Sequence, residues 1–68
     1  MRKEIRLFIE ALKEEVRDKE MTATGIEQDA QQYGQIAAFA PYVAGIRAQA
    51  NETRALIAKM ESDPAICE

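Results

Sequence analysis

Apolar side chains recur three or four positions apart in residues 2–20, which places them on one stripe of a helix. The stripe consists of Ile5, Phe8, Ile9, Leu12 and Val16. No glycine or proline interrupts this stretch, and most of its other residues are strong helix formers. The pattern predicts an amphipathic helix over about residues 2–20.

A reversal of the chain is predicted at residues 21–24. Thr24 and Glu27 have the spacing of a capping box, in which each side chain accepts a hydrogen bond from the backbone N–H of the other residue. Gly25 relaxes the backbone at the same point. A four-residue connection favours an antiparallel helical hairpin. The alternative is a single helix that continues through residues 22–24.

The second half of the chain follows a heptad repeat, abcdefg. The a positions are Ile36, Val43, Ala50 and Ile57, and the d positions are Phe39, Ile46, Thr53 and Met60. The repeat keeps its phase through Pro41, which falls at f, away from the a and d residues. We therefore expect one helix over about residues 25–61, bent at Pro41 because proline removes a backbone N–H and pushes the helix open. The alternative is a break at Pro41, which would give a three-helix bundle.

The two predicted helices differ in length, at roughly 28 Å and 55 Å for a rise of 1.5 Å per residue. The shorter helix would cover the longer one only to about residue 44, and the apolar residues beyond would need cover from another chain. We therefore expect an all-α homodimer with four helices, in which the long helices of two copies pack together. The predicted dimer seam is Ile36, Phe39, Val43, Ile46, Ala50, Ile57 and Met60.

The composition points the same way. The 68 residues include one cysteine, Cys67, and no histidine, so an internal disulfide is excluded and the commonest zinc ligand is missing. A chain this short buries only about 60% of its unfolded surface and usually needs disulfides, metal or partner chains. Assembly with a second copy is the remaining route. We expect Pro64 to end the second helix and residues 62–68 to form a short tail.

Several classes of function are disfavoured. A net charge of −3 argues against nucleic-acid binding, which requires a basic face. The longest apolar run, residues 36–46, falls short of the ~20 residues needed to span a bilayer. The first residues do not have the pattern of a signal peptide, and a lone cysteine suits a reducing compartment, so we expect a cytoplasmic protein. No phosphate-binding loop, metal-ligand spacing or catalytic set is found, so neither enzymatic activity nor a cofactor is expected.

Binding of another protein is the function that the sequence favours. Tyrosine and arginine are enriched at the centre of protein interfaces. The candidate partner-binding residues are Tyr33, Tyr42, Arg47 and Arg54. The two arginines share the e position beside the seam, and we expect their acidic partners to come from a second subunit or from a target protein.

We therefore expect a small acidic helical homodimer that binds another protein and modulates or inhibits it. Short proteins of this class are typical of bacteriophages and mobile elements, which use them against host regulators. One alternative is a structural assembly module without a regulated target. A weaker one is a helix at a membrane surface, which would use Arg2, Lys3 and Arg6.

Overall fold

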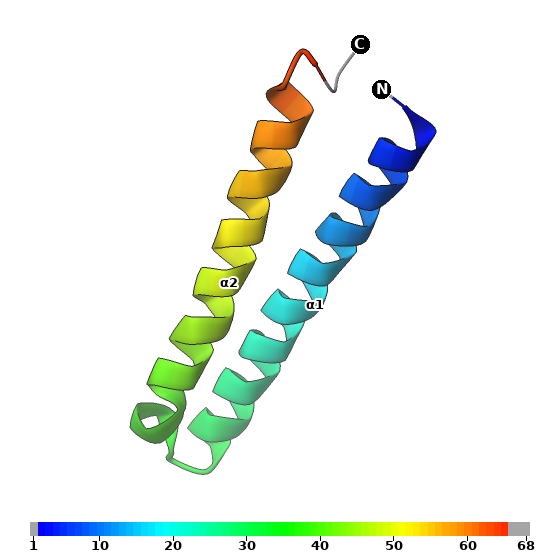
Figure 1. Ribbon diagram of the computed structural model, residues 1–68. Coiled ribbons are helices and arrows are strands. Elements are labelled where there is room, and N and C mark those ends of the chain that lie inside the picture. The colour runs from blue at the N-terminus through cyan, green and yellow to red at the C-terminus, as the bar shows by residue number, and fades with distance from the viewer. Residues whose placement is uncertain (1, 66–68) are drawn as a thin grey trace.

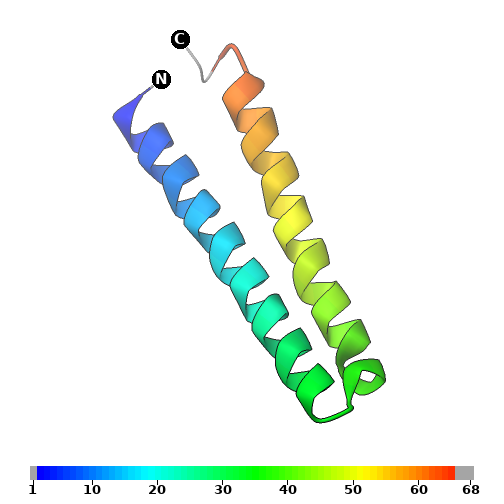
Figure 2. The same ribbon diagram turned by 180° about the vertical axis from the view of Figure 1, so that it is seen from behind.

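The computed structural model describes residues 2–65 and shows two long helices joined by a tight turn (Figure 1). Helix α1 spans Lys3–Gln32 and helix α2 spans Ile36–Ser62. The helices run antiparallel and lie side by side from the turn to the far end, as both views show (Figures 1 and 2). The predicted all-α helical hairpin is confirmed, and Cys67 lies outside the described residues.

The turn occupies residues 33–35 rather than residues 21–24. Residues 21–24 lie inside α1, where the side chain of Ala23 is completely buried. The predicted turn and the helix bounds that followed from it are therefore wrong. The predicted difference in length is wrong as well, because α1 has 30 residues and α2 has 27.

Helix α1 continues because its buried positions recur every seven residues past the expected turn. These positions are Ile9, Val16, Ala23 and Ala30. Alanine is a weak signal of a core position in a sequence, although its small side chain lets two helix backbones approach each other closely. Packing of this face outweighs the low helix propensity of the threonines and the glycine at residues 22–25, which amounts to about 1 kcal/mol or less for each residue.

Gly34 ends α1 and directs the chain into α2. Its φ angle is 68°, in the left-handed region where other residues are strained. The N–H of Gln35 donates to the carbonyl of Ala30 at 2.6 Å, and the N–H of Gly34 donates to the carbonyl of Gln31 at 3.2 Å. This pair of hydrogen bonds forms a Schellman motif, which satisfies carbonyl groups that the end of a helix leaves without partners.

The replacement Gly34→Ala is expected to lower the free energy of unfolding by about 1–2 kcal/mol, because a Cβ atom is disfavoured at this φ angle. The matched control is Gly25→Ala in the middle of α1, where an added Cβ would meet nothing within 4 Å. That change is expected to raise the free energy of unfolding by about 0.4–1 kcal/mol. Urea denaturation followed by far-UV circular dichroism measures both, and effects of the same sign would contradict the assigned turn.

The hydrophobic core is a single seam between the two helices. Its residues in α2 are Val43, Ala50 and Ile57, at the predicted a positions, while Ile46, Thr53 and Met60 at d are half-buried. Ile57 and Ala50 form one cluster with Ile9 and Val16 of α1. The far half of α2 is thus covered by its own chain, and the prediction that it would project beyond the first helix is wrong.

Helix α2 runs through Pro41 without a break, so its predicted continuity at this point is confirmed. Pro41 lies in the second turn of the helix, close to the hairpin turn. Its neighbours Ile36 and Phe39 follow the heptad but remain 49% and 41% exposed. Within residues 2–65, neither helix combines the length and the apolar content that crossing a bilayer requires.

Candidate protein-interaction site

Within the described part of the chain, three ion pairs join α1 to α2 along one edge of the seam. They are Lys13 with Glu61, Glu20 with Arg54, and Glu27 with Arg47. Successive partners are seven residues apart in both helices, and all of them occupy e positions when the buried residues of each helix are counted as a. Each pair is about half exposed, so solvent screens the attraction and the contribution of each pair to stability is small. Their regular spacing favours one register of the antiparallel helices over its alternatives.

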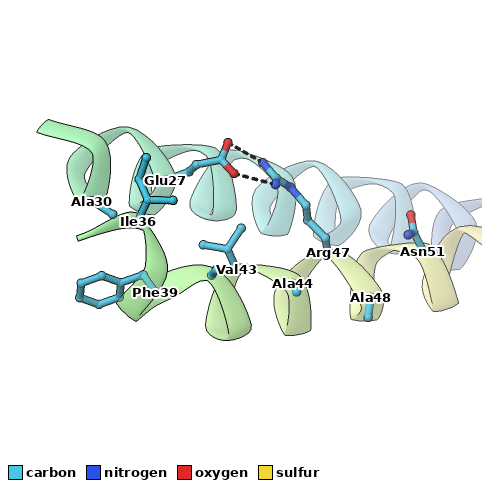
Figure 3. Close-up of a pocket in the computed structure, with 10 residues that line it drawn as sticks. Glu27, Ala30, Ile36, Phe39, Val43, Ala44, Arg47, Ala48 and Asn51 are labelled. Carbon is cyan, nitrogen blue, oxygen red and sulfur yellow. Dashed lines mark hydrogen bonds and ion pairs between the residues drawn. The ribbon is translucent and has the colours of Figure 1, made fainter. Parts of the chain in front are cut away.

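The pair nearest the turn has the best geometry. Arg47 donates from Nη1 to Oε2 of Glu27 at 3.0 Å and from Nη2 to Oε1 at 3.2 Å, so both carboxylate oxygens are used (Figure 3). The hydrogen bond and the positive charge of Arg47 lower the pKa of the Glu27 carboxyl, and the same contact raises the pKa of Arg47. Arg47 and Arg54 thus have acidic partners in their own chain, whereas the sequence predicted partners from a second subunit or a target.

Acid is expected to remove the contribution of the Glu27–Arg47 pair to stability. Because the folded-state pKa of Glu27 is lowered, this contribution is complete above the pKa of an unfolded glutamate and disappears as pH falls through the folded-state value. The difference in melting temperature between the wild type and Glu27→Gln should therefore be largest near neutral pH and vanish in acid.

Glu14→Gln removes the same charge from the outer side of α1 and serves as the control for this titration. Over the same pH range, the melting temperature of Glu14→Gln should stay closer to that of the wild type than the melting temperature of Glu27→Gln does. A pH-independent effect of Glu27→Gln, or an equal effect of Glu14→Gln, would show that the pair does not act through its charge.

A groove of about 470 Å³ opens beside this ion pair, next to the turn. Its walls are Glu27, Ala30, Ile36, Phe39, Ala40, Val43, Ala44, Arg47, Ala48 and Asn51. Figure 3 shows the Glu27–Arg47 pair spanning the two helices, with Ala44 and Ala48 on the side of α2 turned away from α1. Apart from the paired Glu27 and Arg47, every wall residue is uncharged, and most are small and apolar.

Two predicted partner-binding residues flank the turn. Tyr33 is 73% exposed and Tyr42 is 61% exposed. They lie close in sequence to the exposed Ile36 and Phe39, so the turn end of the hairpin carries four large side chains with solvent access. Arg54 is not part of this group, since it lies further along α2 and contacts α1. Of the predicted dimer seam, the structure leaves only Ile36 and Phe39 exposed at this end.

Sequence reasoning missed the acidic partners of the two arginines. The capping-box pattern assigned Glu27 to the start of a second helix, and a turn at residues 21–24 separated it from Glu20. The signal was available, since Lys13, Glu20 and Glu27 are spaced by seven residues with charges opposite to those of Glu61, Arg54 and Arg47. An antiparallel alignment of the two halves of the chain pairs all six.

The described residues contain no group of three or more acidic, histidine or cysteine side chains placed to hold a metal ion. Of the residues that the structure describes, the other large exposed apolar ones are Leu7, Phe8, Met21 and Leu56, which do not line the groove. No protein-family model, curated protein or solved structure matches the chain.

Proposed function

We propose that this chain is a small helical protein that acts as a homodimer in the cytoplasm and binds another protein, whose activity it modulates or inhibits. The observation that carries the proposal is the exposure of Tyr33, Ile36, Phe39 and Tyr42 at one end of the hairpin. Contiguous apolar surface on a small protein marks an interaction site. Aromatic side chains contribute a large share of binding energy at such sites.

The dimensions of the hairpin support assembly. Its radius of gyration is 15.5 Å, whereas a compact domain of this length has a value of about 11 Å. Two helices form only one layer, and a stable domain usually packs two layers around a core. A second hairpin would supply the missing layer. In the proposed dimer, α2 of each copy is bent at Pro41.

The two tyrosines provide a surface for the other protein. By heptad position, Tyr42 at g lies on a different side of α2 from Ala44 at b, which lines the groove. Tyr42 therefore remains accessible when a second copy covers the groove, and Tyr33 is not among the residues that line the groove. An apolar helix of the target could pack across them in the manner of other helix-binding proteins.

Affinity capture from cells that naturally produce the protein tests this function. The wild type should retain a second protein in stoichiometric amount, and the double variant Tyr33→Lys/Tyr42→Lys should lose it. Thr22→Lys/Gln28→Lys adds the same charge to exposed positions of α1 and should retain it. The absence of any captured protein, or equal capture by all three, would contradict the proposal.

A structural assembly module is the second candidate. It is favoured by the ion pairs of Arg47 and Arg54, because both arginines are already neutralised within the chain and offer little to a charged target. Under this alternative, the capture experiment would return only further copies of the same chain.

A further inference from the structure

We propose that the groove beside the turn is an interface for a second copy of this chain, in which the two α2 helices pack antiparallel about a two-fold axis. This inference rests on the homodimer of the proposed function and specifies its surface and orientation. The groove alone does not identify its occupant. The exposed area of the hairpin, the charges around the groove and the order of its side chains identify it together.

The hairpin exposes more surface than a compact monomer of the same mass. The difference matches the area that each partner buries in a standard dimer interface. The chain exposes 5100 Å². A compact protein of this size exposes about 4300 Å², so the excess is about 800 Å². A standard interface buries about 800 Å² on each partner. Contact with one further hairpin is therefore enough to remove the excess.

The charges around the groove select an uncharged occupant. Among the described residues, the charged ones that line the groove are Glu27 and Arg47, which neutralise each other through two hydrogen bonds. A charged partner would have to bury its own charge without a counter-charge, which is strongly unfavourable. The outer side of α1, with Glu10, Glu14 and Asp18 exposed, is excluded as an occupant on this ground. The start of α2 qualifies, because residues 36–46 contain no charged side chain.

The order of side chains favours the antiparallel orientation. Ile36, Ala40, Ala44 and Ala48 line the groove at four-residue intervals and form one row along α2. When this row packs against itself in the antiparallel sense, Ile36 of each copy lies over Ala48 of the other, and Ala40 lies over Ala44. Large side chains then meet small ones at both ends. A parallel pair would instead place the two Ile36 side chains against each other.

Sedimentation equilibrium from micromolar to millimolar concentration tests the surface. The wild type should be dimeric. Ala44→Glu should raise the dimer dissociation constant about a hundredfold or more, because it buries two carboxylates in the interface. Ala44 is exposed in the single hairpin, so the helical circular dichroism signal at high concentration should persist. The control Ala55→Glu makes the same change at an exposed position of α2 outside the groove and should remain dimeric.

Charge rescue tests the orientation. Ala40→Lys mixed with Ala44→Glu should restore dimers, because Ala40 of one copy faces Ala44 of the other in the antiparallel pair. Ala48→Lys mixed with Ala44→Glu should not, because Ala48 faces Ile36. A parallel pair keeps both lysines at equal distance from Glu at position 44 and would give equal rescue. Equal rescue would therefore overturn the antiparallel arrangement.

Two results would overturn the proposed surface, namely a monomeric wild type at all concentrations and a dimer that Ala44→Glu leaves unchanged. A monomeric wild type that still captures another protein, and loses it on Ala44→Glu, would assign the groove to that protein instead. A dimer with the expected variant behaviour but no captured protein would support this inference and contradict only the binding of a target.

Discussion

Replacing Ile57 by alanine is expected to unfold a large share of the molecules. Ile57 is 6% exposed and belongs to the main buried cluster with Ile9, Val16 and Ala50. Removing a buried isoleucine side chain costs about 2–5 kcal/mol, as lost transfer energy and as a cavity. The total stability of a chain of this length is only about 3–10 kcal/mol at the usual value per residue. The melting temperature and the urea midpoint, followed by far-UV circular dichroism, should both fall sharply.

The neighbouring residue provides a matched control. Leu56 has a side chain of similar size, is 46% exposed and lies outside the buried cluster. Both variants introduce alanine, the best helix former, so they differ mainly in the burial of the side chain that is lost. Leu56→Ala should therefore change the free energy of unfolding by only a small fraction of the change caused by Ile57→Ala. Equal losses for the two variants would show that the seam between α1 and α2 is not the source of stability.

Thr22→Pro is expected to have the second-largest effect. Thr22 lies in the interior of α1 and is exposed, so the loss of its side chain removes little packing. Proline in this place removes a backbone hydrogen bond and clashes with the preceding turn of the helix, at a cost of about 3 kcal/mol or more. Melting temperature and helical content should both decrease.

The control at the same position is Thr22→Ala, which keeps the backbone N–H and should leave the stability unchanged or slightly higher. This pair of variants discriminates directly between the two positions of the turn. If residues 21–24 formed the turn that the capping-box pattern predicts, proline at residue 22 would be tolerated.

The sequence was sufficient to predict the fold class and the pattern of α2. Val43, Ala50 and Ile57 occupy the predicted a positions, and the helix runs through Pro41 as its uninterrupted heptad indicated. These features depend on periodicity within one helix. Periodicity is the most reliable structural signal that a single sequence carries.

The position of the turn was not predicted because local and tertiary signals conflict at residues 22–27. Thr24 and Glu27 have the spacing of a helix start, but Glu27 instead pairs with Arg47 of the other helix. The informative signal is a change of heptad phase. The buried positions of α1 are seven residues apart up to Ala30, whereas the next a position, Ile36, follows after only six residues. Gly34 lies within this shortened step and supplies the left-handed residue that the turn requires.

The predicted site followed the predicted turn. Once the turn was placed too early, the far half of α2 lacked cover, and its a and d residues were assigned to a dimer seam. The structure places Ala50 and Ile57 against α1 and leaves Ile36 and Phe39 exposed near the turn. The position of the turn decides how much of α2 lies against α1. It therefore decides which residues of the predicted seam are buried within the chain and which stay exposed.

The outer ends of the two helices lie far from the turn and its exposed apolar side chains. The first turn of α1 and the last turn of α2 lie together at one end, and the turn between the helices lies at the other (Figure 1). The exposed Tyr33 and Tyr42 flank this turn. The longest dimension of the molecule is 50 Å. A fluorescent label or a carrier protein fused before Lys3 or after Ser62 would thus be held at a distance from the groove. Immobilisation through either of these two positions presents the turn outward.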